Sequence, residues 1–140
     1  MKLQFALDGE DVECPASAAI SLALIVHELT TNASKYGALS AAGGSVDVSW
    51  RCDGDRLRLG WVEHGGPPPK PPTRSGFGTK LLRRSVRQFD GTVDMHYAPS
   101  GLELQLSLRL PRKPAKLALA ESIARTACEA AGASAAREVL

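Results

Sequence analysis

The sequence lacks several features that would assign it at once to a class of protein. Its 140 residues carry a net charge of only +2, so we expect no strongly charged surface for nucleic acid or an acidic membrane. No apolar run approaches the ~20 residues of a membrane span. The N-terminal segment alternates and carries acidic residues early, unlike a signal peptide. These absences predict one cytoplasmic domain that contacts neither nucleic acid nor membrane.

Paired cysteines are also missing. The three cysteines are odd in number, far apart in the chain and not arranged as Cys-x-x-Cys; they are Cys14, Cys52 and Cys128. This spacing argues against a zinc site or a disulfide framework. We therefore expect free thiols in a reducing compartment.

What the sequence does contain is a regular succession of strand and helix patterns. Alternating segments predict strands over residues 2–7, 45–52 and 56–63, with the last two joined by an Asp-Gly-Asp turn. Helical spacing marks residues 18–36 and again the segment from Leu81 to Phe89. A second hairpin, turning at residues 99–101, follows the second helix.

The order of these elements predicts an α/β two-layer sandwich with helices on one face of the sheet. After Pro111 the composition becomes rich in alanine. We therefore divide the chain into a domain over residues 1–111 and a C-terminal extension over residues 112–140, for which we expect helical structure.

The first helix separates an apolar stripe from a polar face. The expected stripe follows helical spacing and consists of Leu22, Val26, Leu29, Ala33 and Tyr36. Gly37 is expected to end the helix in a left-handed conformation. Beside the stripe, Glu28, Asn32 and Lys35 lie at positions i, i+4 and i+7 and so share one face.

The polar face offers groups suited to a metal and a phosphate. Carboxylate and amide oxygens are ligands for Mg²⁺, and an ammonium group attracts phosphate. A solvated face with one salt bridge is the alternative for an arbitrary trio of this kind.

Two glycine-containing segments favour a nucleotide site over a solvated face. Glu63 ends a predicted strand just before Gly65 and Gly66, where a carboxylate could accept from the exocyclic amine of adenine. The segment Gly-Phe-Gly-Thr, residues 76–79, leads directly into the second helix, whose N-terminus favours an anion. The order of both segments behind the polar helix face predicts a Mg-nucleotide site.

These segments resemble the ATP-binding domain of the GHKL superfamily, which includes histidine kinases, type II topoisomerase ATPases and Hsp90 chaperones. HELTTNASKYGALS, residues 27–40, resembles the N box, and WVEHGGP with GFGTKLL resembles the two G boxes. The chain is most similar to the HWE group of bacterial histidine kinases, on account of His27 together with Trp61 and Glu63. The resemblance covers residues 1 to about 111 and implies a Bergerat fold with a mixed, mostly antiparallel sheet.

The resemblance also implies roles for individual residues. Asn32 would ligate Mg²⁺, with Glu28 as a second ligand, and Lys35 would contact phosphate. Glu63 would read the adenine amine. The remaining residues implied to bind ATP are Tyr36, Gly65, Gly66, Arg74, Gly76, Phe77, Gly78 and Thr79. His27, Glu28 and Lys35 are the implied catalytic residues, with His27 either a direct proton carrier or a residue that orients its neighbour.

The implied function is transfer of the γ-phosphate of ATP to a histidine in two-component signalling. None of His27, His64 and His96 lies in the His-Arg-x-x-Asn setting of an acceptor. We therefore expect the acceptor on a dimerisation or phosphotransfer domain, in cis in a longer protein or in trans, with a response regulator downstream.

Three features leave alternatives open. The loop between the G boxes is short and rich in proline, which leaves open whether it closes over a nucleotide. The arginines of the second helix are either a solvated face or a dock for an acidic partner. The chain could also be a degenerate docking module without ATP, or a GHKL serine kinase or ATPase.

Overall fold

The structure is a computed structural model that describes residues 4–69, 77–110 and 119–131. In chain order, the elements are β1 (Phe5–Asp8), α1 (Ala16–Tyr36), the short 3-10 helix η1 (Ala38–Ser40), β2 (Ser45–Asp53), β3 (Arg56–His64), α2 (Phe77–Gln88), β4 (Thr92–Ala98), β5 (Gly101–Arg109) and α3 (Leu119–Ala131). The predicted segments are confirmed to within a few residues at their ends wherever they fall in the described ranges.

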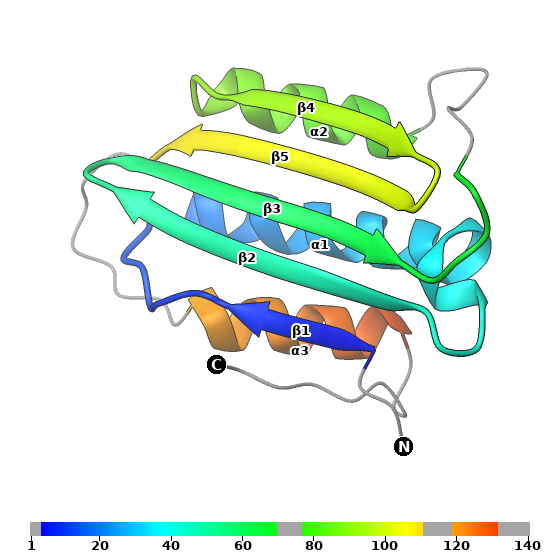
Figure 1. Ribbon diagram of the computed structural model, residues 1–140. Helices are drawn as coiled ribbons and strands as arrows, with labels where there is room; N and C mark the ends of the chain where they lie inside the picture. The colour runs from blue at the N-terminus through cyan, green and yellow to red at the C-terminus, as the bar shows by residue number, and fades with distance from the viewer. Residues whose placement is uncertain (1–3, 70–76, 111–118, 132–140) are drawn as a thin grey trace.

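The strands form one mixed sheet in the order β1-β2-β3-β5-β4 (Figure 1). β1 and β2 are parallel, and the other three neighbouring pairs are antiparallel. All three labelled helices lie behind the sheet in Figure 1, with α1 between α2 and α3. This arrangement confirms the predicted two-layer sandwich with a mostly antiparallel sheet.

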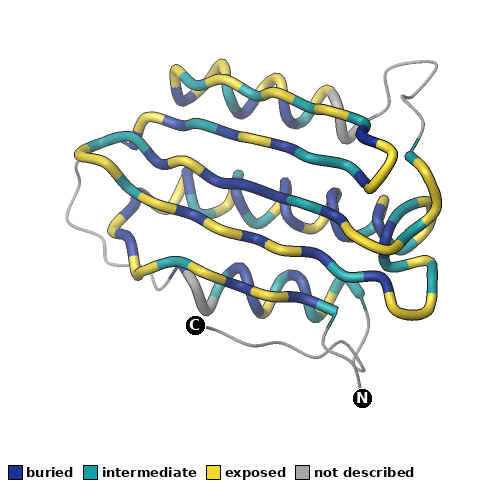
Figure 2. The backbone as a smooth tube through the Cα atoms, viewed as in Figure 1, coloured by how far each residue is buried: buried dark blue, intermediate teal, exposed yellow. Residues whose placement is uncertain are grey.

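The core lies between the sheet and the helix layer. Buried and more exposed residues largely alternate along each strand, so one face of the sheet is buried and the other is exposed (Figure 2). α1 contributes its buried side to this core through Leu22, Val26, Leu29 and Ala33, and also through Ile25.

The end of α1 differs from the prediction in two ways. Tyr36 is 73% exposed, so its place in the buried stripe is wrong. Gly37 does end the helix as its C-cap, and its N–H donates to the Ala33 carbonyl, but its φ of −114° is not left-handed, so the predicted conformation is wrong. The chain instead turns directly into η1, whose Ala38 is buried and takes the next place in the core.

The C-terminal extension contributes to the same core. α3 contacts α1 and β1, and its buried side chains belong to the core cluster of the sheet and α1; they are Leu119, Ile123, Ala124 and Ala127. The helix expected in this segment is therefore present over residues 119–131. The division of the chain at residue 111 stays a prediction.

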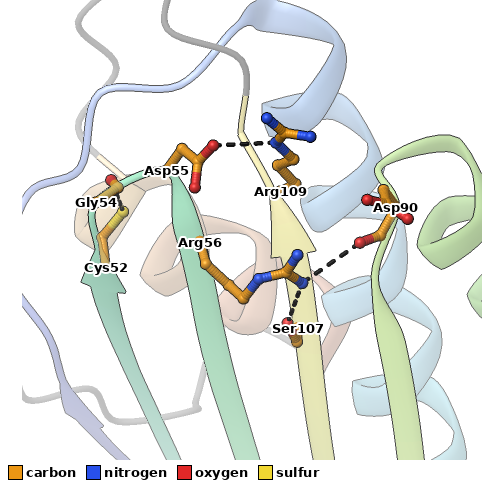
Figure 3. A network of polar contacts seen from close by, with 7 residues as sticks. All are labelled: Cys52, Gly54, Asp55, Arg56, Asp90, Ser107 and Arg109. Atoms are coloured by element: carbon orange, nitrogen blue, oxygen red, sulfur yellow. Dashed lines mark hydrogen bonds and ion pairs between the residues drawn. The ribbon is translucent and has the colours of Figure 1, made fainter.

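A polar network joins the strands at the Asp53–Arg56 turn (Figure 3). Arg109 on β5 donates to Asp55 at 3.0 Å, and Arg56 on β3 donates to Ser107 at 2.9 Å and to the carbonyl of Asp90 at 3.3 Å. These contacts fasten the β2–β3 hairpin to β5 and to the turn after α2.

Among the described residues, no helix is long and apolar enough to cross a bilayer.

Candidate functional site

The polar face of α1 is turned to solvent, as the spacing predicted. Asn32 and Lys35 are exposed and Glu28 is half-buried. Within the described part of the chain, none of the three makes a hydrogen bond or ion pair, so the salt bridge of the alternative is not seen there, while its solvated face is. Three side chains with free oxygen or ammonium groups on one helical face form the donor set that a hard cation and a phosphate require.

His27 lies one turn before Asn32 on the same helix and is exposed. The Thr31 hydroxyl donates to the His27 backbone carbonyl at 2.8 Å, which leaves the imidazole itself uninvolved. Across residues 4–69, 77–110 and 119–131, no hydrogen bond joins the His27 ring to Glu28. Both predicted roles of His27, proton carrier and orienting residue, stay predictions.

Glu63 is the buried charged residue at this end of the sheet. Strand alternation places it on the same side of β3 as Trp61, facing the helix layer, and it is only 5% exposed. The Trp61 indole N–H donates to Glu63 Oε2 at 2.9 Å, and the Ala38 backbone N–H donates to Oε1 at 3.0 Å. A buried carboxylate requires such donors, because an unpaired one is strongly destabilising.

The hydrogen bond between Ala38 and Glu63 joins the end of α1 to the end of β3. Gly37, directly before Ala38, has no room for a side chain, because a Cβ there would collide with Glu63 Oε1. The sequence predictions did not include the contacts that Gly37, Ala38 and the Trp61 N–H make with Glu63. The i, i+2 spacing of Trp61 and Glu63 on one strand could have indicated the contact between their side chains.

The glycines after β3 have a structural role of their own. Gly65 has a φ of +77°, which side-chain-bearing residues rarely adopt. A Cβ on Gly66 would press on the backbone of Ala38 and Gly37. The first glycine segment therefore packs tightly against the end of α1, and its predicted contact with a base stays a prediction, as does that of Tyr36.

The second glycine segment is only partly described. Arg74 and Gly76 lie outside the described residues. Phe77, Gly78 and Thr79 form the first turn of α2, so the predicted helix N-terminus is confirmed at this place. Their contact with phosphate stays a prediction.

The remaining histidines lie on strands. His96 is exposed on β4. His64 follows Glu63 and therefore faces the opposite side of the sheet, where its ring is 2.9 Å from the Asp47 carboxylate. Neither imidazole contacts Glu63.

Two grooves lie away from this corner. One, of about 620 Å³, lies on the exposed face of the sheet and is lined by Ser49, Gly60 and Gln105 among others. The other, of about 640 Å³, runs along α2 and is lined by Lys80, Arg83, Arg84, Arg87 and Gln88. Neither groove is lined by Glu63 or by the polar residues of α1.

Comparisons with known proteins point to one class. The chain is 39% identical over 103 residues to a blue-light-activated histidine kinase of Brucella anthropi and 38% identical over 105 residues to blue-light-activated histidine kinase 1 of Erythrobacter litoralis. These stretches cover 70% and 71% of this chain but only 21% and 29% of those relatives. The chain thus spans less than a third of the length of the curated relatives it matches. No protein-family profile matches it.

Solved structures agree on the fold. The histidine kinase domain of an Erythrobacter litoralis blue-light-activated histidine kinase superposes with a TM-score of 0.66 at 19% identity, over 77% of this chain and 52% of that one. The histidine kinase domain of the E. coli osmosensor EnvZ superposes with a TM-score of 0.54 at 18% identity, over 81% and 80%. At these identities, the superpositions establish the architecture.

Proposed function

The chain is a homologue of the blue-light-activated histidine kinases and has the fold of a histidine kinase catalytic domain, and on this premise we propose that it binds ATP with Mg²⁺ and donates the γ-phosphoryl group to a histidine. The comparisons confirm the predicted resemblance to histidine kinases. In the reaction, the bond between the γ-phosphorus and the β,γ-bridging oxygen breaks, a phosphorus–nitrogen bond forms on the acceptor imidazole, and ADP leaves.

The observation that carries the proposal is the joining of α1 to β3. The hydrogen bond from Ala38 to Glu63 fixes the end of the exposed polar face beside the carboxylate predicted to read the base. The helix that carries the groups proposed for the metal and the phosphates is thus held at its end to the strand that carries the carboxylate proposed for the adenine. Positioning and charge stabilisation are the main requirements of phosphoryl transfer.

Each residue of the corner has a proposed part. Asn32, with Glu28, would hold Mg²⁺, which neutralises phosphate charge when bound. The exposed ammonium of Lys35 would contact phosphate oxygens. The exposed imidazole of His27 would carry a proton.

The acceptor and the downstream partner belong to the same proposal. The acceptor would be a histidine on a dimerisation or phosphotransfer domain, in cis or in trans, and a response regulator would receive the phosphoryl group. We place the reaction in the cytoplasm, where ATP is available and where cysteine thiols are kept reduced.

A titration with a fluorescent ATP analogue, with and without Mg²⁺, tests the nucleotide site. We expect Mg²⁺-dependent binding by the wild type and a loss of at least about tenfold in affinity in Asn32→Ala, which removes a metal ligand. Ser21→Ala, on the same helix but near its other end, is the matched control and should bind as the wild type does. No wild-type binding at millimolar nucleotide would contradict the proposal.

The stability of the phosphorylated product tests the acceptor. Phosphohistidine is labile in acid, so label transferred from γ-labelled ATP to a histidine-bearing partner domain should disappear on acid treatment. Acid-stable label would instead indicate a serine kinase.

One observation favours a second candidate, the docking module without ATP. Both Glu63 oxygens already accept hydrogen bonds from within the fold, as a purely structural carboxylate would. The titration separates the candidates, because the docking module predicts a folded protein that does not bind nucleotide.

A further inference from the structure

Trp61 is a buried tryptophan whose indole N–H donates its hydrogen bond to a carboxylate. The side chain is fully buried, and its ring packs edge-to-face on Phe5 with the ring centroids 6.1 Å apart. This packing fixes the direction of the indole N–H, which points at Glu63 Oε2 at 2.9 Å. Since an indole N–H can only donate, Glu63 Oε2 must be the acceptor in this hydrogen bond.

The surroundings hold the Glu63 carboxylate in one orientation. The Ala38 N–H fixes the other oxygen, Oε1, at 3.0 Å. A Cβ on Gly37 would collide with the same oxygen, and a Cβ on Gly101 would collide with the Glu63 carbonyl. The two donors hold one carboxylate oxygen each, and the missing side chains of Gly37 and Gly101 leave the space that Glu63 occupies.

The carboxylate keeps capacity for a ligand. Each oxygen of an ionised carboxylate has about two acceptor positions. With one internal donor on each oxygen, each oxygen of the Glu63 carboxylate has a second acceptor position that no hydrogen bond within the described residues uses.

The second buried tryptophan of the sheet provides a contrast. Trp50 on β2 is 5% exposed, and its indole N–H donates at 2.7 Å to the backbone carbonyl of Glu10. That contact fastens a loop to the sheet and involves no carboxylate. Trp50 is therefore an internal control for the loss of a buried indole hydrogen bond.

We propose that Trp61 is a positioning residue for base recognition: its indole N–H holds the Glu63 carboxylate in the orientation that accepts the exocyclic amine of adenine. The inference rests on the proposed ATP site and adds a specificity determinant to it. In this proposal Trp61 does not contact the nucleotide and acts only by orienting Glu63.

The test is a ratio of affinities, measured by calorimetry on the full chain with Mg²⁺ present. The two ligands are ATP and an ATP analogue whose purine lacks only the exocyclic amine. The wild type should prefer ATP, and Trp61→Phe should reduce that preference by about tenfold, as expected for the loss of one well-placed hydrogen bond. Trp50→Phe should keep the wild-type ratio.

Two further variants keep the test decisive. In Glu63→Gln the preference should already be lost, and adding Trp61→Phe should change the ratio no further, because the tryptophan acts through the carboxylate. If Trp61→Phe does not fold, Gly37→Ala tests the premise that the orientation of the carboxylate sets the preference. A Cβ there would displace Glu63 Oε1, so the ratio should fall, and an unchanged ratio would overturn the inference.

The outcomes are distinguishable. If Trp61→Phe lowers the affinity for both nucleotides equally, the tryptophan has only a structural role. That result would overturn the inference and leave the proposed ATP site intact. An unchanged ratio would overturn it as well. A wild type that binds neither nucleotide would overturn the proposed function, and the inference with it.

Discussion

Three neighbouring features of the chain are arranged around the Glu63 carboxylate: the Trp61 indole, the Ala38 amide and the side-chain-free Gly37. Glu63→Ala would leave two buried N–H donors without a partner. Each such group costs about 1–3 kcal/mol, so we expect a fall of at least about 1 kcal/mol in the free energy of unfolding. Urea denaturation measures it.

The control for Glu63→Ala is Asp94→Ala, which removes an exposed carboxylate from β4. It should change the free energy of unfolding by no more than about 0.5 kcal/mol. Equal effects of the two substitutions would mean that the two hydrogen bonds to Glu63 contribute nothing.

Asp55 at the β2–β3 turn predicts a dependence on pH. The hydrogen bond from Arg109 lowers the pKa of this carboxyl below its ordinary value (Figure 3). Because the folded pKa is the lower one, the contribution to stability is present above the unfolded pKa of about 3.9 and is lost as the pH falls through the folded pKa.

Thermal unfolding of wild type and Asp55→Asn across this acidic range checks the prediction. The difference in Tm between them should be small, since the pair is exposed, and should shrink as the pH falls. A difference that grows on acidification would contradict the assigned direction of the pKa shift.

At the residue scale, spacing located the polar groups but not their contacts. Glu28, Asn32 and Lys35 share an exposed face, as helical geometry requires. The predictions for Tyr36 and Gly37 were wrong because the conformation at the end of a helix depends on the packing of the next segment. Here the chain enters η1 and places Ala38 on Glu63, a contact between residues 25 positions apart that no local pattern contains.

At the scale of elements, α3 shows how a weak sequence pattern can hide a packed helix. Its alanine-rich sequence permits a helix without indicating a partner. In the structure, Ile123 is 2% exposed within the core cluster that includes α1. The strands and hairpins were predictable because alternation and turn residues are local, whereas the docking of α3 depends on a surface supplied by α1 and β1.

Ile123→Ala tests the contribution of α3. We expect the free energy of unfolding to fall by about 2–4 kcal/mol, because the substitution removes buried methyl groups and leaves a cavity. Glu129→Ala, at an exposed position of the same helix, should be nearly neutral. A neutral Ile123→Ala in chemical denaturation would show that α3 does not stabilise the domain.

At the scale of the whole molecule, local patterns predicted two layers but not the strand order. The parallel pairing of β1 with β2, and the insertion of β5 between β3 and β4, join segments distant in sequence. Only the resemblance to GHKL proteins supplied a mostly antiparallel sheet in advance. The same topology brings β3 to the end of α1, and so assembles the proposed site from segments 25 or more residues apart.

The location of the nucleotide is the central claim, and amide chemical-shift mapping with Mg-ATP tests it most directly on a chain of 14.8 kDa. The account predicts that the shifts concentrate on Asn32, Lys35, Ala38 and Gly65, at the corner where α1 meets β3. Shifts confined to the groove on the open face of the sheet, around Ser49, Gly60 and Gln105, would contradict it.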